Sequence, residues 1–226
     1  MASIYEQALG QDFGKLHPRI RERFGFGSED GVASVGAGVM DRVWHAGLAA
    51  LPLRVGASRH ILLPQSGRDV PFTIRNYAYR DRFGRETVTW CRTFDFPNAA
   101  RKFDATMIYS RQRGRIVDYL GTKQHLAVDL DIAADGNGGI RIRSGDQRFY
   151  EGFLSFRFPS LFAGTADVCE WYDDRIEAFR ISVHVVNPLI GTVLRYSGRF
   201  QALIVPAAGE AAIPPDVRPL REERRE

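Results

Sequence analysis

Segments in which apolar and polar residues alternate one by one constrain the fold of this chain more than any other feature. Successive side chains of a β-strand point to opposite faces, so a period of two predicts a strand with one buried face. Such segments continue from about residue 51 to residue 205. We therefore predict a mainly β fold, of the β-rich α+β type. The clearest segment, residues 87–96, carries one mostly apolar row: Val88, Trp90, Arg92, Phe94 and Phe96.

Turn residues divide this region into about nine strands. The turns include Asp81–Gly84, Asp135–Gly139 and Asp173–Asp174, and residues 159–164 predict one helical turn. Short turns between consecutive strands are typical of an antiparallel meander, and closure of such a sheet removes its exposed edges. We expect a curled or closed antiparallel meander; the alternative is a bent sheet wrapped over the N-terminal helices, and both leave a concave apolar face. The predicted strands are residues 72–79, 87–96, 103–111, 115–121, 123–133, 140–144, 148–158, 177–185 and 195–205.

The first 44 residues have helical rather than alternating spacing. Ser3 and Glu6 form the sequence pattern of a capping box at the start of a helix predicted over residues 3–24, which Pro18 breaks or restarts. A second helix is predicted over residues 32–44, where valines recur every four residues, although two glycines in it lower the helix propensity. The N-terminal part is therefore expected to supply helices to the β fold.

Composition favours one globular domain. Hydrophobic residues make up 44% of the chain, but no stretch of eighteen uncharged apolar residues predicts a membrane span. The first residues lack the basic start and apolar run of a secretory signal. We expect a single β-barrel-like domain with its N-terminal helical segment over residues 1–206, a disordered tail over residues 207–226, and a cytoplasmic location in a bacterial cell.

The excess of basic residues does not indicate a nucleic-acid partner. The formal net charge is +4, yet all but three of the 31 basic residues are arginines, scattered among 27 acidic residues without forming a run. A nucleic-acid surface requires a concentrated basic patch or stripe. We therefore predict no nucleic-acid binding.

No motif of cofactor or metal chemistry is present. The two cysteines, Cys91 and Cys169, match no metal or redox spacing, and the five histidines are dispersed. Phosphate-binding glycine loops and nucleophile-elbow sequences are also missing. The sequence predicts neither a metal nor a cofactor, and it leaves open whether the protein is an enzyme.

Six short patches, spread over nearly the whole chain, resemble a bacterial family catalogued as domain of unknown function 4166. The resemblance implies one intact domain, here a stand-alone copy of a unit that also occurs joined to dehydrogenase-like nucleotide-binding modules. It supplies no activity, substrate or catalytic residue, and it adds a dehydrogenase-like protein or a homodimer as a candidate partner. The patches are Ser3–Phe26 with its Leu-His-Pro and Phe-Gly-Phe sequences, Val39–Trp44, Arg101–Asp104, Asp118–Gly121, Asn187–Gly191 and Tyr196–Phe200.

Three charged residues fall in rows that are otherwise apolar. Arg92 shares a face with Trp90 and two phenylalanines, so it is expected to meet an anionic ligand group; the alternatives are an ion pair with an acid on a facing strand or a rim position near the strand end. Glu177 begins the apolar row of residues 179–185, and Asp118 shares its face with apolar neighbours. Burial would raise the pKa of either carboxyl and suit it to acid–base chemistry; a position at the solvent-exposed rim is the alternative for each.

Three tyrosines complete the candidate ligand contacts. A tyrosine combines apolar area with one hydroxyl that can orient a ligand; the alternative for each is a core aromatic with a satisfied hydroxyl. Together with Trp90 and the charged residues, the expected ligand-binding set is Trp90, Arg92, Tyr109, Asp118, Tyr119, Glu177 and Tyr196.

These features lead to three alternative functions. The first is binding of a hydrophobic small molecule or lipid inside the curled sheet. The second is a cofactor-independent isomerase, cyclase or hydratase acting on a polyketide-like or terpenoid substrate. The third is an interaction role through an exposed aromatic patch that contains Trp44, Trp171 or residues 149–162.

Overall fold

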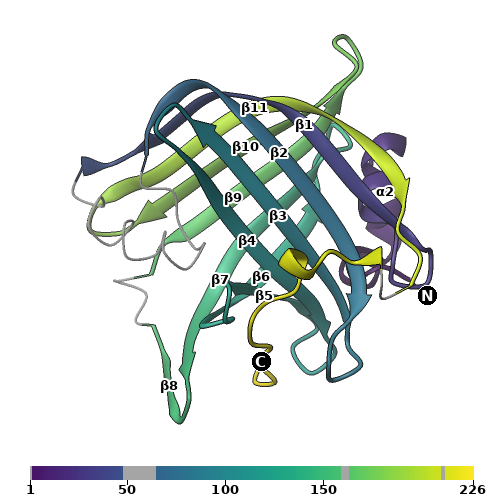
Figure 1. Ribbon diagram of the computed structural model, residues 1–226, viewed down its shortest axis with the longest axis vertical. Coiled ribbons are helices and arrows are strands. Elements are labelled where there is room, and N and C mark those ends of the chain that lie inside the picture. The colour runs from purple at the N-terminus through teal and green to yellow at the C-terminus, as the bar shows by residue number, and fades with distance from the viewer. Residues whose placement is uncertain (1, 48–64, 159–162, 210–211) are drawn as a thin grey trace.

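Ten antiparallel strands close into a barrel, with an eleventh strand attached outside the ring (Figure 1). The computed structural model describes residues 2–47, 65–158, 163–209 and 212–226. The strands are β1 (Val32–His45), β2 (Gly67–Arg80), β3 (Glu86–Phe96), β4 (Ala99–Ser110), β5 (Arg115–Leu120), β6 (Leu126–Ala134), β7 (Ile140–Glu151), β8 (Leu154–Arg157), β9 (Thr165–Asp173), β10 (Ala178–Asn187) and β11 (Gly191–Pro206).

The ring closes because two pairings join the ends of the meander. Strand β1 pairs with both β2 and β11, and β7 pairs with both β6 and β9. Strand β8 pairs only with the end of β7, beyond the part of β7 that contacts β9. The predicted mainly β fold and its closed antiparallel meander are therefore confirmed.

Residues 32–44, predicted as a helix, form strand β1 instead. The glycines provide one reason, since a Cβ at Gly38 would lie 2.1 Å from the carbonyl oxygen of Arg199 on β11. An irregularity between Val39 and Arg42 shifts the register of the pairing with β11. This bulge interrupts the alternation of apolar residues, and the remaining valine spacing imitates a helix.

The boundaries of two other segments also differ from the prediction. Residues 148–158 are not one strand, because Gly152, with a φ of 56°, turns the chain between β7 and β8. The predicted helical turn at residues 159–164 falls largely outside the described residues, as does the start of the alternating region at residues 51–64.

The N-terminal helices close one end of the barrel (Figure 1). They are α1 (Ile4–Leu9), the 3-10 helix η1 (Gly10–Lys15) and α2 (Pro18–Phe24), so the predicted break at Pro18 is present. The capping box is confirmed, since the Ser3 hydroxyl accepts from the Glu6 N–H and the Glu6 carboxylate accepts from the Ser3 N–H. Apolar side chains of α1 and α2 belong to the same core as those of the strands. No helix among the described residues is long and apolar enough to cross a membrane.

The described part of the C-terminal segment packs along the outside of the barrel. Ile213 and Val217, the latter in the short 3-10 helix η4 (Pro215–Val217), are buried against Tyr77 and Tyr79. Further along, the main chain of residues 223–226 accepts hydrogen bonds from side chains of the barrel. The outer aromatic residues of β2 and β5 are thereby covered by the chain itself.

Candidate functional site

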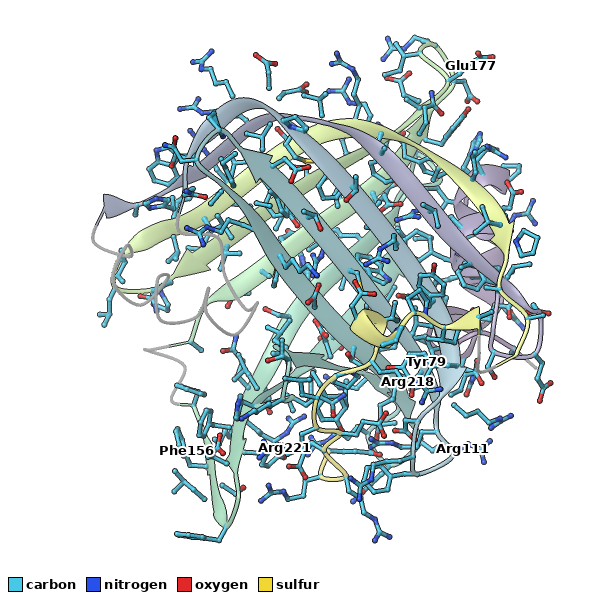
Figure 2. All side chains as sticks on the ribbon, viewed as in Figure 1. Tyr79, Arg111, Phe156, Glu177, Arg218 and Arg221 are labelled. Carbon is cyan, nitrogen blue, oxygen red and sulfur yellow. The ribbon has the colours of Figure 1, made fainter. Side chains whose placement is uncertain are left out.

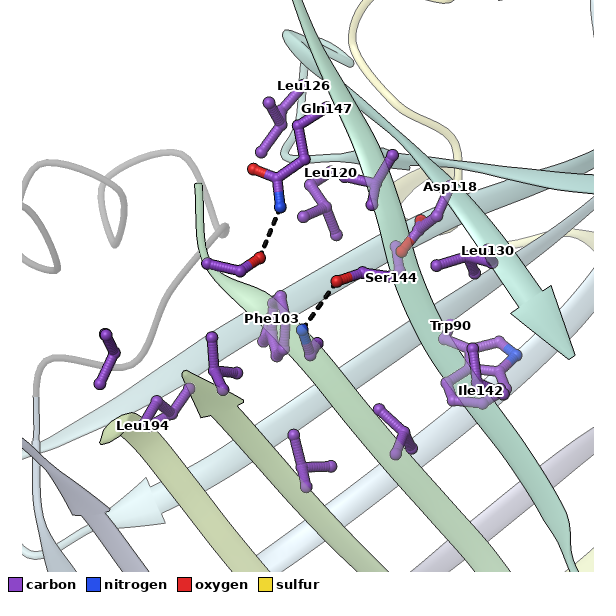
Figure 3. Close-up of a pocket in the computed structure, with 18 of the residues that line it drawn as sticks. Trp90, Phe103, Asp118, Leu120, Leu126, Leu130, Ile142, Ser144, Gln147 and Leu194 are labelled. Carbon is purple, nitrogen blue, oxygen red and sulfur yellow. Dashed lines mark hydrogen bonds between the residues drawn. The ribbon is translucent and has the colours of Figure 1, made fainter. Parts of the chain in front are cut away.

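A cavity of about 430 Å³ occupies part of the barrel interior (Figure 3). Helix α1 lies at its inner end, where Tyr5 contacts Trp90 and places its hydroxyl 3.6 Å from the sulfur of Met107. The interior beside β1, β2 and β11 is filled instead by phenylalanines, including Phe72 and Phe200. Volumes of this size are typical of small-molecule sites. The described lining residues are Trp90, Arg92, Phe103, Ala105, Met107, Asp118, Leu120, Leu126, Val128, Leu130, Ile142, Ser144, Gln147, Phe158, Gly164, Ala166, Val168, Val183, Val185, Asn187, Ile190, Val193 and Leu194.

Three of the polar lining residues bind main-chain atoms of the barrel itself. The Ser144 hydroxyl accepts from the N–H of Ala166 at 2.7 Å, and the Gln147 side chain donates to the carbonyl of Gly164 at 2.5 Å (Figure 3). The Asn187 side chain donates to the carbonyl of residue 163 at 3.0 Å. These contacts hold the chain at residues 163–166, so the two charged lining residues stand out as the polar groups available to a ligand.

Arg92 lies inside the barrel with neutral hydrogen-bond partners. Its guanidinium donates to the Tyr196 hydroxyl at 3.3 Å and to the Phe103 carbonyl at 3.1 Å. The guanidinium carbon also lies 3.9 Å from the centre of the Phe103 ring. Within the described part of the chain, no carboxylate comes within the 4.0 Å of an ion pair with Arg92. The predicted interior position of Arg92 is therefore present, and its direct partners carry no charge.

Asp118 projects from β5 into the same cavity (Figure 3). Its Oδ1 atom is buried and has no hydrogen-bond partner among the described residues. Burial raises the pKa of Asp118 to about 7, while the positive charge of Arg92 acts in the opposite direction. A carboxyl group with this pKa changes protonation state near neutral pH and is chemically available from the cavity.

A second pair of buried charges, not foreseen from the sequence, lies nearer the helices. Arg23 of α2 donates through Nε to Glu170 of β9 at 2.6 Å and through Nη1 to the Ser34 hydroxyl at 2.6 Å. Both charged side chains are about 1% exposed. Burial raises the pKa of Glu170, and the charges of Arg23 and Arg92 lower it. Glu170 alternates with Val168 on the inward face of β9, which is the only sequence signal that could have indicated it.

The predicted site residues do not all lie together. Trp90, Arg92 and Asp118 line the cavity, and Tyr196 contacts it indirectly through Arg92. Tyr109 is half-buried against the core and does not reach the cavity.

Two of the predicted residues, Tyr119 and Glu177, lie outside the cavity, and for Glu177 this is the exposed alternative that the sequence left open. Tyr119 faces outward and its hydroxyl donates to the Arg225 carbonyl at 2.9 Å. Glu177 is exposed in the turn between β9 and β10, with a φ of 49°, because β10 begins one residue later at Ala178 (Figure 2). Neither side chain can contact a ligand inside the barrel.

The aromatic residues considered for an interaction role differ in exposure. Phe153 is fully exposed at the turn between β7 and β8, and Phe156 on β8 is 43% exposed (Figure 2). Trp44 and Trp171 are half-buried, and an arginine lies over each ring. Among these aromatic residues, the exposed ones therefore belong to the hairpin formed by β7 and β8.

The cysteines are both unpaired thiols. Burial raises the pKa of Cys91 to about 12 and that of Cys169 to about 11, which keeps both protonated at neutral pH. Among the described residues, no three histidine, cysteine, aspartate or glutamate side chains are grouped as a metal site would require.

The architecture and the cavity define a closed antiparallel β-barrel with a mainly apolar internal pocket. Residues 16–200 match the model of the family described as domain of unknown function DUF4166, and the chain belongs to this family. A relative is the protein named "Uncharacterized protein YndH" of Bacillus subtilis strain 168, which is 32% identical over 202 residues that cover 89% of this chain and 97% of the relative. The resemblance inferred from short sequence patches is thereby confirmed.

Proposed function

We propose that the protein binds a hydrophobic small molecule or lipid inside its barrel. The cavity carries this proposal, because protein interiors are close-packed and rarely retain an empty volume of about 430 Å³. Water would find few hydrogen-bond partners along the leucine, valine and isoleucine side chains of the wall. An apolar ligand that displaces this water would therefore gain the most binding free energy.

The polar residues of the cavity support a ligand with one polar end. Arg92 lies over the ring of Trp90, and its charge influences Asp118, while most of the other lining side chains are aliphatic. A molecule with an apolar body would place its polar group against this pair and leave the remainder in contact with the aliphatic wall.

One observation favours a second function, that of a cofactor-independent isomerase, cyclase or hydratase acting on a polyketide-like or terpenoid substrate. Asp118 presents an unpartnered carboxyl oxygen to an apolar cavity, with a pKa of about 7 that suits proton transfer near neutral pH. For this function, Asp118→Asn would abolish conversion of a bound substrate while binding persisted. Unchanged ligand after prolonged incubation would support binding alone.

The binding proposal is tested by filling the cavity. Ala166 on β9 lines the cavity, whereas its neighbour Thr165 is exposed on the opposite face of the strand. Ala166→Phe is expected to weaken binding of Nile red, a neutral fluorescent dye that responds to apolar surroundings, at least tenfold, because its ring occupies the ligand's space. Thr165→Phe adds the same ring outside the barrel and is expected to leave the affinity unchanged. Equal affinities of both variants would contradict binding in the cavity.

A further inference from the structure

Among the residues that the structure describes, the barrel has two buried arginines, Arg23 and Arg92, and a carboxylate pairs with Arg23 but not with Arg92. Arg23 is paired with Glu170 at 2.6 Å. Arg92, which is 5% exposed, has the Tyr196 hydroxyl and the Phe103 carbonyl as its partners. A buried guanidinium without a directly paired anion is costly, so the surroundings of Arg92 favour an additional negative charge. The cavity provides the space in which that charge can be placed.

Asp118 supplies part of this negative charge in the absence of a ligand. The electrostatic influence of Arg92 on Asp118 is attractive, but the two side chains form no direct ion pair. Asp118 is thus a distant counter-ion for Arg92. A ligand anion in direct contact with the guanidinium would replace it in that role and would repel the ionised carboxylate.

The other groups near Asp118 do not offer a competing proton site. Tyr5 of α1 faces it, and burial raises the pKa of the Tyr5 hydroxyl, which therefore stays protonated. Glu170 is influenced by the charge of Arg92 but is held in a direct ion pair by Arg23. Burial also raises the pKa of Tyr196, which is hydrogen-bonded to Arg92. Among the described interior groups, Asp118 is consequently the carboxyl that lines the cavity without a direct ion pair and can change charge when an anion enters.

We infer that the cavity selects an amphiphile with a carboxylate head, which Arg92 holds, and that Asp118 takes up one proton from solvent when this ligand binds. This inference rests on the proposed binding function and specifies the chemical class of the ligand. Arginine suits the role because its planar guanidinium can donate two parallel hydrogen bonds to a carboxylate. Proton uptake keeps the total charge inside the barrel unchanged: one negative charge arrives with the ligand and one is neutralised on Asp118.

The first test compares decanoate with decanol, which share an apolar chain and differ in the head. Both are titrated calorimetrically into the unmodified full-length protein at pH 6, below their aggregation concentrations. Decanoate is expected to bind at least tenfold more tightly. Equal or tighter binding of decanol would overturn the inference and leave binding of an apolar ligand intact. Failure of both molecules to bind, and to displace Nile red, would instead remove the proposed function.

The second test measures protons directly. Titrations of decanoate at pH 8 in buffers with different ionisation enthalpies are expected to give an uptake close to one proton, and the affinity is expected to fall by up to about tenfold per pH unit between pH 7 and pH 9. Asp118→Asn should abolish both the uptake and this pH dependence. Asp95→Asn, at an exposed position of β3, is the matched control and should retain them. No uptake in the unmodified protein at pH 8 would overturn the proton coupling.

A third test addresses Arg92. Arg92→Gln is expected to abolish the preference for decanoate over decanol while Nile red binding persists. Persistent Nile red binding shows that the variant is folded around an intact cavity. A variant that binds the dye and still prefers decanoate would overturn the assignment of Arg92. If the variant does not fold, the comparison of decanoate with decanol in the unmodified protein still tests the choice of head group.

Discussion

At the scale of single residues, the interior polar groups are placed where an apolar core would normally exclude them. Alternation along β3 and β5 was sufficient to predict that Arg92 and Asp118 share faces with apolar neighbours, and both line the cavity. The same reasoning failed for Glu177, because alternation does not show at which residue a strand begins, and the turn ends only at Ala178. Tyr119 adjoins Asp118, so alternation already places it on the opposite face of β5. The sequence did not show that the distant C-terminal segment covers it there.

The raised pKa of Asp118 predicts how stability depends on pH. Because its pKa is about 7 in the folded protein and lower in the unfolded chain, the folded state binds the proton more tightly. The stabilisation contributed by neutral Asp118 is therefore complete at low pH. It is lost as the pH rises from the unfolded pKa through about 7.

Asp118→Asn removes the group that must ionise and is therefore expected to stabilise the unliganded protein at pH 8. At about 1.4 kcal/mol per pH unit, the gain in the free energy of unfolding is on the order of 2–4 kcal/mol. At pH 4 the variant and the parent protein should differ little. Urea unfolding at both pH values measures the difference in the free energy of unfolding between the variant and the parent protein, with Asp95→Asn as the surface control. A destabilised variant at pH 8 would show that ionised Asp118 is stabilised by the fold.

At the scale of elements, strands were predictable where the alternation is uninterrupted and the turn is local. Strand β3 satisfies both conditions. Strand β1 does not, because its register shifts between Val39 and Arg42 and its glycines permit close packing against β11, which follows more than 140 residues later. The packing of the C-terminal segment is not predictable from its sequence for a related reason. The segment's apolar residues are few and far apart, and its binding surface is formed by distant strands.

The packing of the C-terminal segment gives a prediction at this scale. Val217 is 2% exposed against the outer face of the barrel, whereas Leu220 is 78% exposed. Val217→Asp would bury an unpaired carboxylate and is expected to lower the free energy of unfolding by about 2 kcal/mol or to release the segment. Thermal unfolding and limited proteolysis after residue 206 measure the two outcomes. Leu220→Asp should change neither, and equal behaviour of the two variants would contradict the packed arrangement.

At the scale of the whole molecule, closure of the barrel creates the candidate site. The interior is closed at one end by α1 and filled on one side by phenylalanines, and the remaining volume is lined by β3 to β7 and by β9 to β11. A concave apolar face was predictable from the number of alternating segments. The size of the cavity was not predictable. It depends on which interior positions carry large side chains, and on a strand register that the sequence alone does not reveal.

The position of the ligand is tested most directly by contact quenching of Trp90. The chain has three tryptophans, and only Trp90 lines the cavity, so the double variant Trp44→Phe/Trp171→Phe leaves one internal fluorophore. Bromine quenches tryptophan fluorescence on close approach, and a brominated decanoate is expected to quench Trp90 saturably, with unbrominated decanoate reversing the effect. Binding of the brominated ligand without quenching of Trp90 would contradict a ligand site inside the barrel.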